Sequence, residues 1–203
     1  MKKNKISKNW INKQKRDIYV KQSKIEGYRS RAVYKLQEIN EKFKILRNDI
    51  AIADLGAAPG SWSQYVSRKF KKTKIVSIDI KDMEEIENIY QIKGDFTEEI
   101  QQKKIINYFG NKIDVVISDM AVNTTGNKNL DSLVTGELTI KALNFSVNTL
   151  KKQGIFVSKI FMGSSFNEIV KIAKKKFKDV HIFKPPASRK NSKENFIICK
   201  YLR

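Results

Sequence analysis

Hydrophobic positions along the chain form short runs that are separated by longer amphipathic stretches. The short runs are rich in Val and Ile and have the length of strands. We expect strands over residues 49–55, 74–80, 89–96, 112–120, 154–161, 179–184 and 195–202. The amphipathic stretches predict helices over residues 30–42, 61–70, 98–109, 132–150 and 165–177.

The expected strands are almost continuously apolar, which is typical of a parallel sheet that helices cover on both faces. Strands that alternate with helices predict a doubly wound α/β fold, Rossmann-like and mostly parallel. A chain of 203 residues, 40% of them hydrophobic, supports one core. We therefore expect a single domain over residues 28–203, preceded by a basic extension over residues 1–27.

The charge balance changes the picture, because 41 Lys and Arg face 21 Asp and Glu, a formal net charge of +20. Such a surplus predicts a polyanionic partner, although lysine also serves simply as a solubilising residue. Cys199 is the only cysteine and His181 the only histidine, so we expect no disulfide and no metal site. No apolar run has the length of a membrane span, and we expect neither membrane association nor a secretion signal.

The segment "IADLGAAPGSWSQY" (residues 52–65) places a glycine turn between the first strand of the expected sheet and the next helix. In doubly wound sheets this turn is the usual ligand cradle. Gly56 and Gly60 allow a ligand to approach the backbone, and Ser61 is expected to cap the helix. The turn lacks the G-x-G-x-x-G of a dinucleotide site and the Gly-Lys-Ser/Thr of a P-loop. It favours a nucleoside with an uncharged or cationic tail, and S-adenosyl-methionine fits that description.

Two aspartates end the following strands. Asp79 lies about 20 residues beyond the turn, where an acidic side chain commonly accepts from ribose hydroxyls. The alternative is a surface aspartate at a strand end. Asp95, in "KGDF", is expected to accept from the adenine amine. This spacing predicts a methyltransferase.

Seven motifs then occur in order: "GYRSRAVYKLQEI", "DLGAAPGSWSQYV", "SIDI", "GDF", "VVISDMAVN", "GIFVSKIF" and "KPPASRKNSKENFII". Through them the chain, from about Trp10 to Ile198, resembles the FtsJ/RrmJ family of ribosomal RNA ribose 2′-O-methyltransferases. The resemblance implies a catalytic tetrad at Lys35, Asp119, Lys159 and Glu194. It also implies contacts to S-adenosyl-methionine from Gly60, Trp62, Asp79, Asp95 and Asp119. The family's usual "SDMAPN" is "SDMAVN" here, and Val122 in place of proline is expected to affect substrate fit in that loop.

The chemistry itself favours a lysine base. A ribose hydroxyl must lose its proton during methyl transfer, and the single histidine leaves lysine as a plausible acceptor. A free lysine has a pKa of roughly 10.4, so burial and a second lysine nearby must lower it. Lys159 lies in an apolar run and is the expected base, with Lys35 as its like-charge neighbour and a donor to the ribose. The alternative is a strand lysine that reaches solvent.

Basic residues gather at two places in the sequence. The first 35 residues contain twelve Lys and Arg, interleaved with Trp10, Tyr19, Tyr28 and Tyr34, and a second cluster spans residues 184–193. Basic side chains hold RNA phosphates, and aromatic rings stack on unpaired bases. The alternative for the first twenty residues is a disordered tail that touches nothing.

The resemblance implies that the substrate is large-subunit ribosomal RNA, at a uridine of the peptidyl-transferase A-loop, as free RNA or within the large ribosomal subunit. A ribose methyltransferase for transfer RNA or the messenger cap would use the same tetrad. A catalytically silent RNA-binding assembly factor is the alternative of a different class, and it would be expected to have lost tetrad residues. The family serves both bacterial cytoplasm and organelles such as mitochondria, and a monomer is expected.

Overall fold

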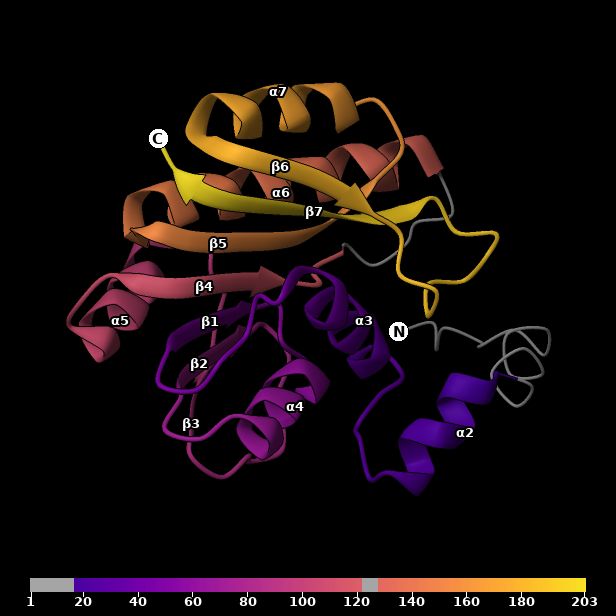
Figure 1. The fold of residues 1–203 in the computed structure, drawn as a ribbon, viewed down its shortest axis with the longest axis vertical. Coiled ribbons are helices and arrows are strands. Elements are labelled where there is room, and N and C mark those ends of the chain that lie inside the picture. Colours follow the sequence, from indigo (N-terminus) through magenta and orange to yellow (C-terminus); the bar gives the residue numbers. More distant parts are fainter. Residues whose placement is uncertain (1–16, 122–127) are drawn as a thin grey trace, which may run out of the picture.

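A computed structural model describes residues 17–121 and 128–203 (Figure 1). Within these residues, seven strands form one sheet in the order β3-β2-β1-β4-β5-β7-β6. The strands are β1 (Ala51–Leu55), β2 (Lys74–Asp79), β3 (Ile89–Lys93), β4 (Ile113–Ser118), β5 (Leu150–Phe161), β6 (Phe177–Phe183) and β7 (Glu194–Leu202). Neighbours from β3 to β5 pair in parallel, and β7 pairs antiparallel to both β5 and β6. The predicted doubly wound, mostly parallel α/β fold is confirmed.

Helices cover both faces of the sheet (Figure 1). The covering helices are α3 (Val33–Phe43), α4 (Ser61–Lys69), α5 (Glu99–Phe109), α6 (Lys128–Thr149) and α7 (Phe166–Lys176), whereas α2 (Ile18–Ile25) lies apart from the sheet (Figure 1). Side chains of α3 and α4 pack with Ile52 and Ile75 in one apolar core, whereas α5, α6 and α7 pack with Ala53 and Val76 in the other. Successive residues of a strand point to opposite faces, so two covered faces explain the continuous apolar runs.

Several element boundaries differ from the prediction. α6 begins at Lys128 rather than at residue 132, and β5 begins at Leu150, directly after α6, rather than at residue 154. The register between β4 and β5 shifts between Ile113 and Val115, which accommodates the extra residues of β5. The predicted cap at Ser61 is wrong, because Gly60 precedes the helix and the Ser61 hydroxyl lies 2.8 Å from that of Ser30.

The predicted basic extension over residues 1–27 contains α2. The Asp17 side chain caps this helix by accepting a hydrogen bond from the Tyr19 N–H (3.1 Å). Residues 1–16 and Val122 lie outside the described residues, so the domain boundary at residue 28 and the effect of Val122 stay predictions.

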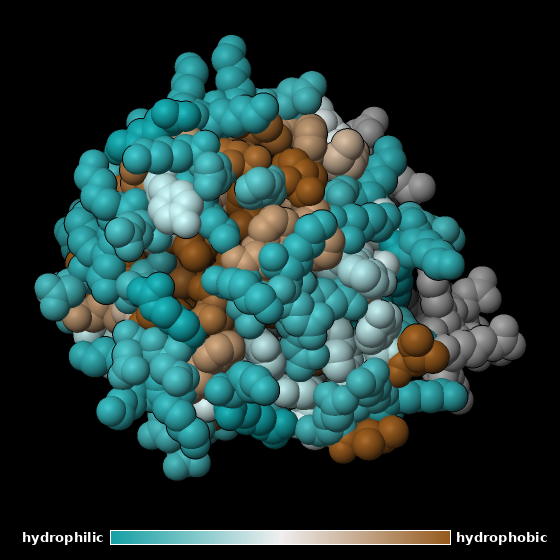
Figure 2. All heavy atoms as spheres, in the orientation of Figure 1, coloured by the Kyte–Doolittle hydropathy of each residue, from teal (hydrophilic) through white to brown (hydrophobic). Residues whose placement is uncertain are grey.

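The surface in the view of Figure 2 is mostly hydrophilic, with a broad apolar area in its middle and upper part and smaller apolar spots over α2, where Ile18 and Ile25 are exposed. No helix within residues 17–121 and 128–203 combines the length and apolar character that crossing a membrane requires.

The order of the strands reverses between β1 and β4, which are neighbours in the sheet but not in the sequence. In open α/β sheets, ligands bind beyond the carboxyl ends of the strands at this point. The Gly56–Gly60 turn follows β1, and Asp119 follows β4. The fold therefore brings the glycine turn and the predicted catalytic acid to the same place.

Candidate active site

A cavity of about 480 Å³ opens beyond the carboxyl ends of β1, β2, β3 and β4. Its lining includes Gly56, Asp79, Asp95, Phe96, Asp119 and Met120. A smaller hollow of about 40 Å³ shares Gly56, Ala58 and Asp119 with it, and Asp54 and Trp62 line its other walls. The volume of the larger cavity falls in the range typical of small-molecule sites, roughly 300–1,000 Å³.

Both glycines of the turn have a positive φ, and a side chain at either position would clash with neighbouring atoms. Gly56 has φ 73°, and a Cβ there would lie 2.1 Å from Met120 Cγ. Gly60 has φ 99°, and a Cβ there would lie 2.8 Å from Ile86 Cδ1 and 3.0 Å from Arg29 Nη1. Gly56 lines the cavity, but Gly60 does not belong to the lining of either hollow. Gly60 instead allows Ile86 and Arg29 to pack against the turn.

The four residues of the predicted tetrad meet beside this cavity. Lys159 Nζ, on β5, donates to the Asp119 carbonyl oxygen at 2.6 Å and to Asp119 Oδ1 at 2.9 Å. Lys35 Nζ, on α3, lies 3.5 Å from Asp119 Oδ2 and 2.8 Å from Glu194 Oε2. Asp119 therefore joins both lysines through its two carboxylate oxygens, and Lys35 links it to Glu194.

Burial and opposite charges compete within this cluster. Burial alone lowers the pKa of Lys35, but the carboxylates of Asp119 and Glu194 more than offset this effect, so the pKa lies above its ordinary value. Burial alone raises the pKa of Asp119, but Lys159 and Lys35 hold it below its ordinary value. Lys35 is therefore protonated and Asp119 ionised at neutral pH. Lys159 is only 6% exposed, so it is not a strand lysine that reaches solvent.

The predicted cofactor residues are placed in different ways. Asp79 accepts from Ala58 N–H (2.9 Å) and Lys81 N–H (2.8 Å), and Asp95 accepts from Thr97 N–H (2.8 Å). Both carboxylates line the larger cavity and keep further lone pairs for a ligand. Trp62 lines only the smaller hollow, where it packs on Phe196 and donates its indole N–H to the Ala32 carbonyl (2.8 Å).

Asp54, at the end of β1, is a site residue that the sequence reasoning did not assign. It is 1% exposed, lines the smaller hollow and accepts a hydrogen bond from the Ser63 hydroxyl (2.7 Å). Burial raises its pKa to about 7. Its signal in the sequence is the single acidic residue inside the apolar run before the glycine turn.

The donor set of the two hollows fits S-adenosyl-methionine. Four aspartates, Asp54, Asp79, Asp95 and Asp119, line the hollows although the whole chain carries a net charge of +20. Carboxylates accept hydrogen bonds from ribose hydroxyls and attract the sulfonium and ammonium groups. Apolar side chains of Ile78, Phe96 and Leu138 line the larger cavity and suit an adenine ring.

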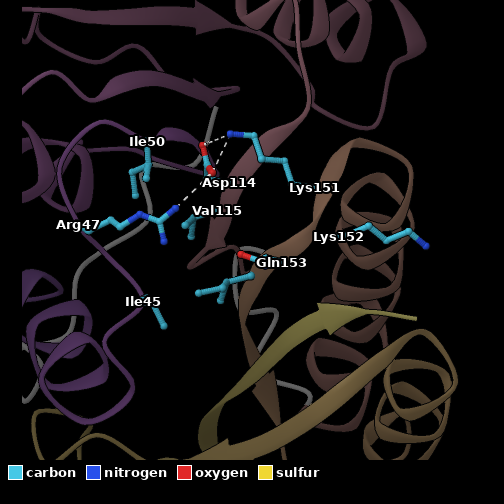
Figure 3. Close-up of a pocket in the computed structure, with 9 residues that line it drawn as sticks. Ile45, Arg47, Ile50, Asp114, Val115, Lys151, Lys152 and Gln153 are labelled. Carbon is cyan, nitrogen blue, oxygen red and sulfur yellow. Dashed lines mark hydrogen bonds and ion pairs between the residues drawn. The ribbon is translucent and has the colours of Figure 1, made fainter.

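A separate cavity of about 360 Å³ lies near the amino ends of β4 and β5 (Figure 3). Asp114 binds Lys151 at 2.8 Å there and lies 3.8 Å from Arg47. None of the predicted site residues lines this cavity, and the tetrad lies at the opposite edge of the sheet. The candidate active site is therefore the one at the carboxyl edge.

Comparisons with known proteins agree with this geometry. The model of the FtsJ-like methyltransferase family matches residues 28–202. The ribosomal RNA large subunit methyltransferase E of Pelagibacter ubique is 66% identical over 203 residues, the full length of both chains, and that of Rickettsia akari is 44% identical over 95% of this chain and 88% of its own. A Plasmodium falciparum structure described as a ribosomal RNA methyltransferase has a TM-score of 0.78 and 34% identity, covering 86% of this chain and 98% of its own.

A Streptococcus mutans structure described as a methyltransferase in complex with SAH shares the fold, with a TM-score of 0.53 and 14% identity over 82% of this chain and 97% of its own. The family match, the full-length relatives and the acidic cavity at the switch point lead to one conclusion. The chain belongs to the FtsJ-like methyltransferase family, whose cofactor is S-adenosyl-methionine.

Proposed function

We propose that this chain methylates the ribose 2′-hydroxyl of a uridine in the A-loop of large-subunit ribosomal RNA. Methylation of large-subunit ribosomal RNA follows from the names of the full-length relatives. The choice of the ribose hydroxyl rests on one observation, that a partly buried carboxylate joins two lysines beside the larger cavity. This arrangement is suited to holding and deprotonating a hydroxyl group.

Bound S-adenosyl-methionine supplies a methyl group on a positively charged sulfur. Asp79 and Asp95 bind and orient the adenosine part, and Asp54 lines the smaller hollow, where a bound cation would favour its ionised form. Asp119 lines both hollows and contacts both lysines, so it lies between the bound cofactor and the groups that handle the proton.

The two lysines have different roles in the proposed reaction. The raised pKa of Lys35 keeps it protonated, so it donates a hydrogen bond to the ribose and cannot accept a proton. We assign the base to Lys159, whose neutral Nζ would accept the proton of the 2′-hydroxyl while the methyl group moves from the sulfonium to the ribose oxygen and leaves a neutral thioether. The carboxylate and carbonyl oxygens of Asp119 fix the position of Lys159 Nζ and stabilise the ammonium that forms.

Basic residues next to Glu194 are available for the RNA backbone. Lys190 and Lys193 are exposed, whereas Lys184 donates to the carbonyls of Lys190 (3.1 Å) and Ser192 (2.7 Å) and so stabilises the loop. We propose that Lys190 and Lys193 hold phosphates near the target ribose. The strongly similar Pelagibacter and Rickettsia relatives favour a bacterial cytoplasm over an organelle as the location of the enzyme. A monomer stays the expected state.

The test is methyl transfer from labelled S-adenosyl-methionine to intact large subunits and to free ribosomal RNA. A 2′-O-methyl group blocks alkaline cleavage at its nucleotide, so the cleavage pattern maps the product. We expect label at one A-loop uridine, and we expect Lys159→Ala to abolish turnover while its affinity for the cofactor is retained. Lys152→Ala is the matched control, because Lys152 is exposed at the other end of the same strand.

Full turnover by Lys159→Ala would exclude Lys159 as the base. Label on transfer RNA or cap ribose, with none on large-subunit RNA, would replace the proposed substrate. Cofactor binding without transfer to any of these RNAs would instead support a silent assembly factor.

A further inference from the structure

The loop between β6 and β7 is held to α3 through one buried residue, Ala187, which is 1% exposed. Its N–H donates to Glu38 Oε2 on α3 at 2.8 Å. Its carbonyl oxygen accepts a hydrogen bond from the guanidinium of Arg31, two residues before α3. Both polar groups of this peptide are therefore held by charged side chains, which make stronger hydrogen bonds than neutral ones.

The next residue, Ser188, contacts the tetrad. It is 5% exposed, and its hydroxyl donates to Glu194 Oε1 at 2.7 Å. The other oxygen of the same carboxylate, Oε2, accepts from Lys35 Nζ at 2.8 Å. The two bonds set the rotation of the Glu194 carboxylate, because each oxygen has its own donor. Without the Ser188 hydroxyl, the carboxylate has one fewer constraint on its orientation toward Lys35.

Helix α3 carries both ends of this chain of contacts. Lys35 and Glu38 are three residues apart, so they lie on the same face of the helix. Glu38 holds the loop, the loop presents Ser188, Ser188 orients Glu194, and Glu194 binds Lys35. The contacts form a closed ring that starts and ends on one rigid helix.

Helix α2 braces this ring from outside. Asp17 lies 3.2 Å from Arg31 and 3.7 Å from Arg189, and the Tyr19 hydroxyl donates to Glu38 Oε1 at 3.3 Å. The negative charge of Asp17 offsets the positive charges of two arginines that would otherwise repel each other. The second oxygen of Glu38 is therefore also occupied.

We propose that Ser188, held in place by Glu38 and Arg31 through Ala187, is a positioning residue that fixes Glu194 against Lys35 for catalysis. This inference rests on the proposed role of the tetrad. Ser188 acts through Glu194 and does not touch the reacting atoms. Its contribution is to the rate of the chemical step and not to the binding of cofactor or RNA.

The test compares Ser188→Ala, Glu38→Ala and Glu38→Gln with wild type. The glutamine keeps an oxygen that accepts from Ala187 N–H, whereas the alanine removes it. Glu41→Ala is the control, because Glu41 is exposed one turn further along α3. Measured quantities are kcat, KM for large subunits, Kd for S-adenosyl-methionine, the thermal unfolding midpoint, and the NMR titration of Lys35 Nζ.

We expect kcat to fall about tenfold or more in Ser188→Ala and Glu38→Ala, the loss typical of one hydrogen bond to a charged group. KM, Kd and the unfolding midpoint are expected to stay close to wild type in Ser188→Ala. Glu38→Gln and Glu41→Ala are expected to retain kcat. In Ser188→Ala the Lys35 titration is expected at lower pH than in wild type, because a misoriented Glu194 supports the Lys35 ammonium less.

A wild-type kcat together with an unchanged Lys35 titration in Ser188→Ala would overturn the inference. Parallel loss of kcat, cofactor affinity and unfolding midpoint in this variant would also overturn it, since that pattern indicates a general structural role. The titration needs no RNA substrate. If wild type methylates no A-loop uridine but the titration shifts, the proposed function fails and the positioning by Ser188 stands.

Discussion

Asp79 lies at the edge of the larger cavity. Its oxygens accept from Ala58 and Lys81 N–H groups, and we propose that the same carboxylate also accepts from the ribose of the cofactor. We predict that Asp79→Ala raises the Kd for S-adenosyl-methionine about ten- to a hundredfold, since hydrogen bonds to a charged group contribute about 1.5–3 kcal/mol. Isothermal titration calorimetry measures this effect. Asp82→Ala, at an exposed aspartate three residues on, is the control, and equal affinities of the two variants would contradict the assignment.

Asp54 makes the stability of the protein depend on pH. Burial raises its pKa to about 7 in the folded chain, above the roughly 3.9 of an unfolded aspartate. Its contribution to stability is therefore fully present below about pH 4 and is lost as the pH rises to about 7. We predict that Asp54→Asn, which resembles the neutral acid, is more stable than wild type above pH 7 and equal to it near pH 4. Urea unfolding at several pH values measures the difference.

Asp179→Asn is the matched control for this prediction, because Asp179 is exposed on the edge strand β6. Its unfolding free energy is expected to follow that of wild type across the pH range. A constant difference between Asp54→Asn and wild type, independent of pH, would show that Asp54 does not titrate in this range.

The resemblance to the family implied which residues form the tetrad, but the sequence did not indicate which residues support it. Asp119 and Lys159 lie at the carboxyl ends of neighbouring parallel strands, so the alternation of elements already places them together. Ser188 and Glu38 are separated by 150 positions and meet through the backbone of Ala187. Neither a hydrophobic period nor a sequence motif predicts a hydrogen bond to a buried peptide group. The roles of Ser188 and Glu38 could therefore be inferred only from the three-dimensional structure.

Arg29, which precedes α3, holds the glycine turn after β1 in place through hydrogen bonds. Arg29 donates to the carbonyls of Pro59 (3.1 Å), Glu84 (2.8 Å) and Glu85 (2.9 Å). It thereby joins the turn to the segment between β2 and β3. We predict that Arg29→Ala raises the Kd for S-adenosyl-methionine about tenfold, because the turn and this segment border the cavity. Fluorescence or calorimetric titration of the cofactor measures it.

Arg29→Lys separates geometry from charge in this prediction. Lysine keeps the charge but lacks the planar fork that reaches three carbonyls, so it is expected to bind the cofactor almost as weakly as the alanine variant. Arg47→Ala, at an arginine side chain that is 75% exposed near the opposite edge of the sheet, is the control. Full rescue by lysine would show that charge, and not the fork, supports the site.

Strands with a continuous apolar run were predicted well. The start of β5 and helix α2, which lack an apolar pattern, were not predicted. The β1, β2 and β4 runs lie within the predicted ranges because both of their faces are buried. The start of β5 was missed because Lys151, Lys152 and Gln153 are exposed, so this part of the strand lacks the apolar signal. Helix α2 was missed because its sequence has almost no apolar face, and Ser23 is its only buried residue.

The distribution of charge over the whole molecule separates two kinds of binding. The chain has a net charge of +20, yet the cofactor cavity is lined by aspartates. A cationic surface is expected to attract RNA and a negative cavity to attract a cationic cofactor, so the two proposed ligands have different places on the same molecule. The net charge predicted a polyanionic partner. It could not predict the acidic cavity, because a net charge sums over all residues and hides a local cluster of aspartates.

The basic residues ahead of α2 are expected to contact RNA phosphates. Residues 1–16 contain seven Lys and Arg and no Asp or Glu, whereas Asp17 and Tyr19 brace the loop that orients Glu194. A chain that lacks residues 2–16 therefore tests RNA binding without disturbing this brace. We predict that the shortened chain retains the unfolding midpoint and cofactor affinity of the full chain. We also predict that its affinity for ribosomal RNA depends less steeply on salt, because each lost phosphate contact lowers the slope of log K against log[salt] by about 0.7–0.9.

Filter binding of ribosomal RNA between about 50 and 200 mM salt measures the slope. The matched control replaces Lys174, Lys175 and Lys176 at the end of α7 by Gln, because these residues are exposed on another element. Equal slopes for the full and shortened chains would mean that residues 2–16 contact no phosphates, and the basic residues beside Glu194 would then carry RNA binding. If the salt dependence becomes flatter in the shortened chain but not in the α7 variant, residues 2–16 contact RNA phosphates directly. The α7 variant also loses positive charge, so a general loss of charge would flatten both slopes.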